Sequence, residues 1–557
     1  MVQSKVSDKK VHISGRKGKN MKKKMMKKRL ISLLLAASMV LSLAACGKGG
    51  SGSGSSAEKN TEVGSYTPEY PIVDEEITIT GMVMTENADD SVREDRIVWN
   101  EVMNVTGINI EWVFIDRDAV STYLASNDWP DFFLTSFNNS VINDYGIAGG
   151  KFVNLLDYIG WMPNLAKTFE DYPEAKKAAT EINGEMYAFP GISAGVTAVY
   201  AKPFYRTDLA EAAGYTKTPT TVEEFRDMLR AVKNYTGEAP FIPRLDMSLN
   251  YWMLPLYCAF GTSTDMTFDV SSEGKVSYSR TSDQMKHFYE YMNSLYDEGL
   301  IHKEAATMET SQIKELELSG KVCVIELAQT LLSNEYFTDG QVHLAALAPL
   351  TSEYDSTQTY PDRSPVIFQS GPYLNANSEY IVEMCKMFDI MYATEEVVEG
   401  TGLYGMSFTY GMEGLDWDYE GDSYVFHTPE AYGDSNNTYI YAEMIWNNAG
   451  RCDGFGDMIV QGTGNNAVRQ RQYADNVLPY ETDQYIWGFV NFTEDEQAVL
   501  DNKYTDINNY ALEMCAKFIT GVVDIETGWA DYCARIEQMG INEVLEVYQA
   551  SYDRWCE

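Results

Sequence analysis

Residues 191–195 read G-I-S-A-G and fit the G-x-S-x-G pattern of hydrolases that attack an acyl group through serine. That chemistry needs a strand before the serine and a helix after it, because the hydroxyl must stand exposed at a sharp turn. Here Pro190 precedes the tract, and residues 196–200, V-T-A-V-Y, have the pattern of a strand. The sequence therefore does not predict a nucleophile at Ser193.

Other catalytic and metal-binding patterns are weak. Residues 462–467 fit a loosened dinucleotide-binding fingerprint, but no strand–turn–helix pattern surrounds them. The histidines beyond residue 45, at positions 287, 302, 343 and 427, are scattered and form no H-E-x-x-H motif. Carboxylate pairs of the kind that glycosidases use are inevitable among 82 Asp and Glu residues, so their presence is no sign of hydrolysis. We expect no catalytic residues, no metal and no cofactor.

The N-terminal tract that ends at Cys46 indicates export and lipidation. Basic residues crowd positions 22–29, an apolar run covers 30–43, and small residues lead to the cysteine. A charged head, a short apolar middle and a small-residue cleavage site are typical of a secretory signal. Residues 43–46, L-A-A-C, resemble the bacterial lipobox, in which the signal peptidase cuts before a cysteine that then carries lipid. The alternative is an uncleaved membrane anchor with an incidental cysteine.

The leader fixes the first boundaries of the chain. A normal signal begins at Met21, so translation from there would give a complete leader. We assign residues 1–45 to the leader, 46–70 to the lipidated cysteine and a flexible Gly/Ser linker, and 71–557 to an extracellular body. No second apolar segment of membrane-spanning length follows Ser56, so we expect a soluble body held to the membrane by lipid alone.

The chain is strongly acidic, with 43 Lys and Arg residues against 82 Asp and Glu residues and a formal net charge of -39. Because 12 of the basic residues and one acidic residue lie in residues 1–45, the remainder carries a net charge near -50. Such a surface repels nucleic acid and anionic lipid, and we expect neither as a direct partner of the body. The 38 Tyr, 22 Phe and 10 Trp residues supply core and also rings that could stack on sugars.

The cysteines indicate no disulfide framework. Seven follow Cys46, which is an odd number, their spacings are wide, and no C-x-x-C motif occurs. We expect most of them to be small buried apolar residues.

The body is too long for one core and begins with alternating strands and helices. Strand patterns cover residues 75–84, 107–115 and 129–134, and helix patterns cover 90–105 and 119–127. This alternation implies a parallel sheet with right-handed crossovers. In such sheets ligands bind beyond the carboxyl ends of the strands, which indicates residues 135–139.

Further along, Thr221 and Glu224 form a capping box at the start of a helix over residues 222–233. Helix patterns also cover residues 283–299, 378–394 and 506–520, and a buried strand is expected at 322–327.

Several phrases, taken in order, extend over most of the body. Residues 124–131 read L-A-S-N-D-W-P-D, residues 183–190 read N-G-E-M-Y-A-F-P, residues 219–225 read P-T-T-V-E-E-F, and residues 547–554 read V-Y-Q-A-S-Y-D-R. Together they resemble the large extracellular solute-binding lipoproteins of carbohydrate ABC transporters from Gram-positive bacteria. The resemblance covers residues 75–555 and depends on the order and spacing of the phrases.

The resemblance implies a periplasmic-binding-protein-like fold of type II, with two α/β lobes, a hinge and a ligand cleft between the lobes. We expect the first lobe in residues 71–200 and a middle segment near 325–400, and the second lobe in the remainder. Such lobes close on the ligand, and the permease would bind the closed form.

A sugar site needs aromatic faces for ring stacking and planar polar groups for the hydroxyls. Candidates at strand ends and loops are Asp131, Ser136, Asn138, Trp252, Glu326, Gln329, Tyr373, Tyr410, Glu413 and Trp417. The alternative is that the aromatic members are core, that Glu326 bonds within a hinge, and that residues 416–422 form a solvated hairpin.

One tract departs from the family pattern. Relatives that bind calcium carry an Asp/Asn/Gly-rich loop just before an Ile-Pro pair, whereas residues 233–243 here read K-N-Y-T-G-E-A-P-F-I-P. Calcium needs several carboxylate or carbonyl oxygens, so we expect no calcium at this position.

The resemblance implies a monomeric binding protein that captures an oligosaccharide and delivers it to an ABC permease without catalysis. Two alternatives stay open: a surface glycoside hydrolase or polysaccharide lyase, and a sensor that presents its closed lobes to a membrane receptor. A peptide ligand is a further alternative. The identity of the sugar does not follow from the sequence.

Overall fold

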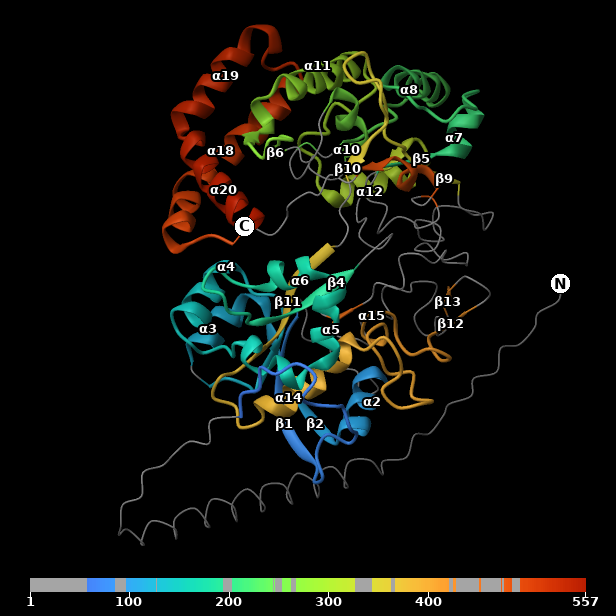
Figure 1. Ribbon diagram of the computed structural model, residues 1–557. Helices are drawn as coiled ribbons and strands as arrows, with labels where there is room; N and C mark the ends of the chain where they lie inside the picture. Colours follow the sequence, from blue (N-terminus) through green and yellow to red (C-terminus); the bar gives the residue numbers. More distant parts are fainter. Residues whose placement is uncertain are drawn as a thin grey trace, which may run out of the picture. The chain divides into compact units, whose positions relative to one another are not determined.

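Figure 1 shows the computed structural model of the chain, and residues 57–557 form one compact unit. The structure describes residues 58–85, 97–126, 128–193, 203–243, 245, 253–261, 267–325, 343–361, 366–419, 424–426, 450–451, 472, 475–482 and 491–557. The predicted leader and Cys46 lie outside these residues. Within them, no helix combines the length and the apolar character that crossing a bilayer requires.

A six-stranded mixed sheet organises the first lobe, with the strand order β14-β4-β11-β3-β1-β2. Its strands are β1 (Ile77–Thr85), β2 (Ile108–Asp116), β3 (Phe132–Leu134), β4 (Ala188–Ser193), β11 (Val366–Leu374) and β14 (Gly450–Arg451). β1 pairs in parallel with both β2 and β3, as the sequence predicts. β11 lies between β3 and β4 and runs antiparallel to both, which local patterns did not predict.

The two faces of this sheet carry separate apolar clusters. The helices that cover them are α2 (Ile97–Thr106), α3 (Val120–Ala125), α4 (Asn139–Val141), α5 (Pro163–Asp171), α6 (Pro173–Ala179), α14 (Ile381–Asp389) and α15 (Ser407–Tyr410). Phe132 packs on one face with Trp99 and Phe388, because neighbouring strand residues point to opposite faces, and Phe133 packs on the other with Phe152. Gly81 of β1 is required at its position, since a Cβ there would overlap the Phe132 ring.

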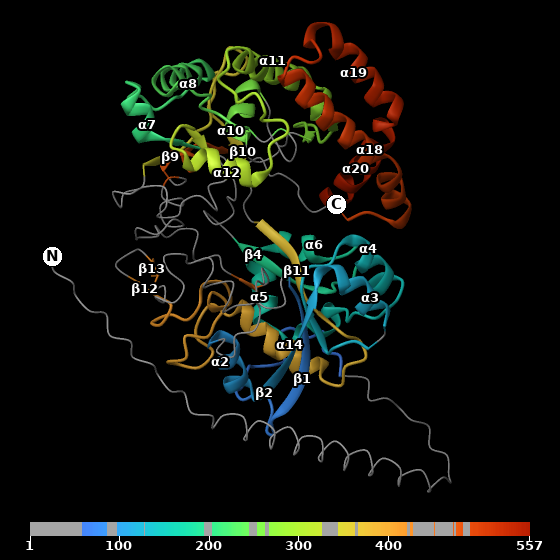
Figure 2. The same cartoon turned by 180° about the vertical axis from the view of Figure 1, so that it is seen from behind.

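Short strands and many helices build the second lobe around a third apolar cluster. Its strands are β5 (Phe204–Arg206), β6 (Phe268–Val270), β7 (Val276–Tyr278), β8 (Val324–Ile325), β9 (Leu344–Ala346), β10 (Tyr360–Pro361) and β15 (Glu481–Thr482). Its helices are α7 (Thr207–Ala212), α8 (Val222–Thr236), α10 (Leu254–Tyr257), α11 (Asp283–Asp297), α12 (Thr310–Leu318), α18 (Glu494–Ile519), α19 (Ile525–Met539) and α20 (Ile541–Cys556). β5 is the central strand of a sheet with the order β8-β5-β9. Figures 1 and 2 both show α7 and α8 at one end of this lobe and α18–α20 at the other.

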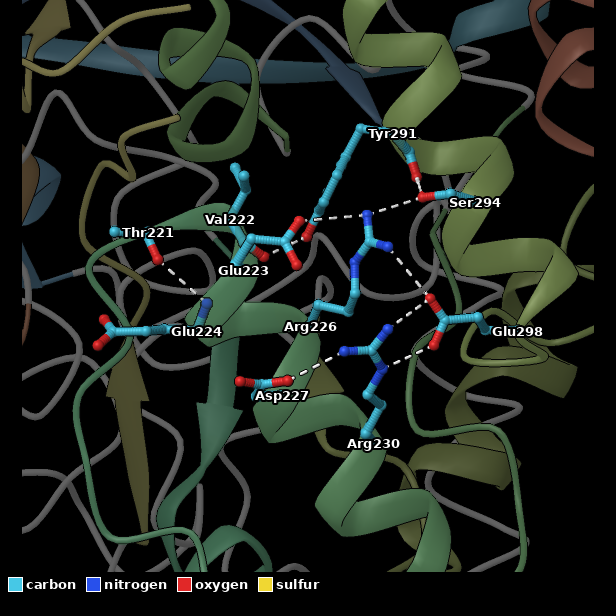
Figure 3. Close-up of polar contacts among 10 residues, drawn as sticks. All are labelled: Thr221, Val222, Glu223, Glu224, Arg226, Asp227, Arg230, Tyr291, Ser294 and Glu298. Carbon is cyan, nitrogen blue, oxygen red and sulfur yellow. Dashed lines mark hydrogen bonds and ion pairs between the residues drawn. The ribbon is translucent and has the colours of Figure 1, made fainter. Parts of the chain in front are cut away.

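Thr221 is confirmed as the N-cap of α8, and ion pairs join this helix to α11 (Figure 3). Thr221 Oγ1 accepts a hydrogen bond from the Glu224 backbone N–H at 3.1 Å. The other half of the predicted capping box does not form, because the Glu224 carboxylate accepts hydrogen bonds from the backbone N–H and Oγ1 of Thr220. The carboxylate of Glu298, at the end of α11, accepts a hydrogen bond from Arg226 Nη1 at 3.1 Å and another from Arg230 Nε at 2.7 Å. The hydrogen bond from Arg230 is the main cause that lowers the pKa of Glu298. These contacts fix α8 against α11.

The C-terminal helices α18, α19 and α20 pack against the apolar cluster of the second lobe. α18 begins at Glu494, twelve residues before its predicted start, because Thr493 and Glu496 form a reciprocal capping box. The Asn491 side chain donates to the Thr180 carbonyl oxygen at 2.8 Å, next to the end of α6. Among the described cysteines, Cys258, Cys323, Cys385 and Cys515 are buried, as expected.

Candidate functional site

The loop after β3 carries polar side chains at the carboxyl end of that strand. Ser136 and Asn138 are exposed, whereas Phe137 between them packs into the cluster that contains Phe133. Asn138 also begins α4, because its Oδ1 accepts a hydrogen bond from the Val141 backbone N–H at 3.0 Å. The loop therefore turns two predicted ligand contacts, the Ser136 hydroxyl and the Asn138 side chain, toward solvent.

Two buried hydroxyls lie behind this loop. Thr135 is 7% exposed, and its Oγ1 forms no hydrogen bond within the described part of the chain. The hydroxyl of Tyr373 comes near the Phe137 backbone without a hydrogen bond of normal geometry. Buried hydroxyls of this kind are commonly satisfied by ordered water or by a ligand.

Tyr373 supports the loop from inside. It lies opposite Phe133 in the β-sheet register and is fully buried, and its ring centroid is 4.9 Å from that of Phe137. The prediction that its ring face contacts a ligand does not agree with this burial. Gly371 brings β11 close to the same loop, since its φ is +75° and a Cβ there would lie 2.5 Å from the Thr135 carbonyl oxygen.

Asp131 lies at the opposite end of β3, where its carboxylate bonds to β1 and to the segment that precedes α14. Its Oδ2 accepts hydrogen bonds from the Thr80 backbone N–H at 2.7 Å and from Thr80 Oγ1 at 2.8 Å. Its Oδ1 accepts a hydrogen bond from Ser378 Oγ at 2.6 Å. Both carboxylate oxygens are thus used within the protein, so this placement does not support the prediction that Asp131 binds a ligand.

The last predicted group lies near α15 and the hairpin of β12 (Trp417–Tyr419) and β13 (Tyr424–Phe426). Trp417 is fully buried, and its Nε1 donates to the Gly411 carbonyl oxygen at 3.0 Å, so it is a core residue here. Glu413 is exposed and accepts a hydrogen bond from the Tyr404 hydroxyl at 3.2 Å. Tyr410 ends α15. The predicted contacts Trp252, Glu326 and Gln329 lie outside the described residues.

Glu181, between α6 and β4, is a titratable residue that sequence patterns missed. Burial raises its pKa to about 7, and the described residues offer its carboxylate no ion pair. Its charge also contributes to the raised pKa of Tyr187 and of Tyr373, which places it near both phenols. No motif in the sequence distinguishes Glu181 from the many other acidic residues.

In residues 233–243, the tract that departs from the calcium-loop pattern, two of the described polar contacts involve lysines, Lys233 and Lys321. α8 ends at Thr236 and is capped by Gly237, whose φ is +76°. The ammonium group of Lys233 donates to the Glu298 carbonyl oxygen at the end of α11. Glu238 pairs with Lys321 at 3.0 Å. One carboxylate that is already paired with a lysine does not fit a hard cation that needs several oxygens. Nor do the described residues contain a group of three or more His, Cys, Asp or Glu residues suited to a metal.

We therefore expect thermal stability to be independent of calcium. Treatment of residues 57–557 with a chelator such as EDTA, followed by addition of calcium, should move the melting temperature by less than about 1 °C, because no metal is linked to folding. Differential scanning calorimetry measures this shift. A fall of several degrees in the chelator, reversed by calcium, would contradict the expectation.

Comparison with known proteins identifies relatives over nearly the whole chain. The family model described as "Domain of unknown function (DUF3502)" matches residues 488–557, which contain α18, α19 and α20. The chain is 23% identical over 563 residues to the fructooligosaccharide ABC transporter substrate-binding protein FusA of Streptococcus pneumoniae serotype 4. That match covers 94% of this chain and 97% of FusA.

Solved structures show the same architecture. An EF-hand mutant of Streptococcus pneumoniae FusA in complex with fructo-nystose gives a TM-score of 0.68 at 19% identity, over 86% of this chain and 99% of that chain. An extracellular solute-binding protein from Bifidobacterium longum subsp. infantis gives a TM-score of 0.69 at 19% identity, over 87% and 99%. These likenesses confirm the predicted two-lobe type II fold.

Proposed function

We propose that this protein captures an oligosaccharide and delivers it to an ABC permease, and that it acts by binding without catalysis. The observation that carries the proposal is its end-to-end similarity to a fructooligosaccharide-binding protein, at 23% identity over 94% of this chain. The similar fold of an extracellular solute-binding protein supports the same function. The particular sugar is left to experiment.

The proposal includes a lipid anchor and an extracellular location. Its support is the tract that ends in L-A-A-C at Cys46, followed by a Gly/Ser-rich segment. In this arrangement the body works as a monomer outside the cell, and the lipid on Cys46 is its contact with the membrane. Cys46→Ala should abolish incorporation of labelled fatty acid into the protein and leave the leader uncut, which the mass of the chain measures.

The first test is a thermal-shift screen of residues 57–557, which form a compact unit, against neutral oligosaccharides, acidic oligosaccharides and peptides. A ligand that binds only the folded state at a hundred times its Kd adds about 2.7 kcal/mol of stability. Saturable shifts with a few related neutral glycans, which remain intact during incubation, support the proposal. Shifts with peptides alone, or loss of a glycan during incubation, would contradict it.

Once a glycan is found, Ser136 and Asn138 are the first residues to change. Ser136→Ala should weaken binding about tenfold if its hydroxyl contacts the glycan, since one hydrogen bond is worth about 1 kcal/mol or slightly more. Ser121→Ala, at an exposed position on α3, is the matched control. Isothermal titration calorimetry measures both, and equal affinities of the two variants would remove the loop after β3 from the site.

A further inference from the structure

The first residues that the structure describes are bound tightly to the first lobe. The Asn60 backbone N–H donates to the Asp157 carbonyl oxygen, and the Gly160 N–H donates to the Asn60 carbonyl oxygen, both at 2.9 Å. Trp161 Nε1 donates to the Glu58 carbonyl oxygen at 3.0 Å. These bonds join residues 58–60 to the 3₁₀ helix Leu155–Trp161. We call residues 58–73 the strap.

The close contact between the strap and this 3₁₀ helix depends on Gly160. A Cβ on Gly160 would overlap the side chain of Asn60 and lie 2.7 Å from the Glu62 carbonyl oxygen. The Asn60 side chain cannot move aside freely, because it donates to Ser65 Oγ at 2.9 Å and accepts from the Glu62 backbone N–H at 3.0 Å. At Gly160, therefore, the strap lies so close to the backbone of the helix that no side chain fits between them.

Charged and aromatic contacts continue along the strap. Lys59 Nζ lies 2.6 Å from Asp157 Oδ2, and this hydrogen bond raises the pKa of Lys59. The rings of Tyr66 and Trp161 meet edge to face with centroids 5.4 Å apart. The Nζ of Lys386 on α14 lies 4.7 Å from both ring centroids. Cation–π attraction from this ammonium group therefore holds Tyr66 and Trp161 against the first lobe.

The last part of the strap enters the core of the first lobe. Tyr70, Ile72 and Val73 pack against the cluster that contains Phe132. The Ile72 backbone N–H donates to the Thr106 carbonyl oxygen at 2.9 Å, and burial raises the pKa of Tyr70. The chain then enters β1 at Ile77. The beginning, the middle and the end of the strap thus contact the first lobe, through its 3₁₀ helix, α14 and its core, respectively.

We propose that the strap is a docking segment that attaches the membrane tether to the first lobe at Trp161. This inference depends on the proposed lipidation of Cys46. Even fully extended at about 3.5 Å per residue, residues 46–58 span no more than roughly 40 Å. The strap therefore keeps the Trp161 face of the first lobe within that distance of the bilayer. If the strap were released, residues 58–70 would lengthen the tether about twofold.

The first test needs neither lipid nor sugar, so it separates the strap from the proposed function. In residues 57–557, hydrogen–deuterium exchange should find the amides of Asn60 and Ile72 protected, and trypsin should cut slowly after Lys59. Gly160→Ala should raise exchange over residues 58–66 and cleavage after Lys59 at least tenfold. Gly528→Ala, where a Cβ meets only side chains, is the control. Fast exchange of residues 58–66 in the unaltered protein would overturn the proposal.

The second test measures attachment in the lipidated full-length chain on vesicles. A donor dye on Glu383→Cys, one turn from Lys386 on α14, is paired with an acceptor on lipid headgroups, in a Cys556→Ser background. Energy transfer should fall at least twofold on Gly160→Ala and stay unchanged on Gly528→Ala. Equal transfer in Gly160→Ala and the parent would overturn the proposal, whereas failure to bind vesicles at all would instead contradict lipidation of Cys46.

Discussion

Alanine in place of Gly371 is expected to lower the free energy of unfolding by at least about 3 kcal/mol, because backbone strain and overpacking add. Gly371 has φ +75°, a region that L-residues with a Cβ adopt at a cost. A Cβ there would also lie 2.5 Å from the Thr135 carbonyl oxygen, a backbone atom that cannot rotate away. Since Thr135 begins the loop that carries Ser136 and Asn138, glycan affinity should fall as well. Urea unfolding and calorimetric titration measure the two effects.

The chain offers a matched control for this substitution. Gly184 has φ +82°, but a Cβ there meets no atom within 4 Å. Gly184→Ala therefore introduces the backbone strain without the clash and should cost about 1 kcal/mol. If Gly371→Ala and Gly184→Ala destabilised the protein equally, close contact between β11 and the loop after β3 would have no energetic role.

Removal of the Asp389 carboxylate should be the second large effect. Asp389 is buried at the end of α14 and caps the start of α5. Its Oδ1 accepts from the Leu165 backbone N–H at 2.8 Å, and its Oδ2 accepts from Asn164 Nδ2 at 2.9 Å and the Asn164 backbone N–H at 3.2 Å. Asp389→Ala leaves the buried Leu165 N–H and the half-buried Asn164 donors without this acceptor, so we expect a loss of about 2–4 kcal/mol, measured by urea unfolding. A loss below about 1 kcal/mol would contradict this role.

The same residue predicts a dependence of stability on pH. Burial raises the pKa of Asp389 to about 7, against an ordinary value of 3.8, although its hydrogen bonds favour the charged form. A carboxyl group whose pKa is higher in the folded state than in the unfolded state contributes its full stabilisation when the pH lies below the unfolded pKa, where both states are protonated. This contribution is lost as pH rises from about 4 to about 7. Urea unfolding between pH 4 and 8 should show a smaller decline in Asp389→Asn than in the parent, because Glu181, whose pKa burial also raises to about 7, contributes to both. The same decline in both would assign it to another group.

The elements that the sequence predicts well are those with local causes. The alternating residues of β1 and β2 appear where expected, and Thr221 caps α8 because its side chain and the Glu224 backbone N–H are three residues apart. The true start of α18 was missed, because its first turns carry acidic and polar residues with little apolar periodicity. β11 was missed for another reason: its place is set by pairing with β3 and β4, which are distant in sequence.

The exposure of the candidate site residues was predicted correctly where topology decides it and wrongly where core packing does. Ser136 and Asn138 follow a parallel strand and are exposed, as that position implies. Tyr373 and Trp417 are core residues, because an aromatic residue in one sequence has the same pattern whether it packs inside or faces a ligand. Asp131 precedes its strand, and its bonds to Thr80 and Ser378 depend on partners that only the folded sheet brings near.

The position of β11 also constrains how the protein matures. β3 ends at Leu134 and β4 at Ser193, but the strand that joins them begins only at Val366. A chain made from its N-terminus therefore holds two apolar strands with open edges until residues 366–374 emerge. The first lobe should consequently fold late and be the part most dependent on chaperones during export. A chain cut short before Val366 would leave an aggregation-prone fragment, not a smaller working lobe.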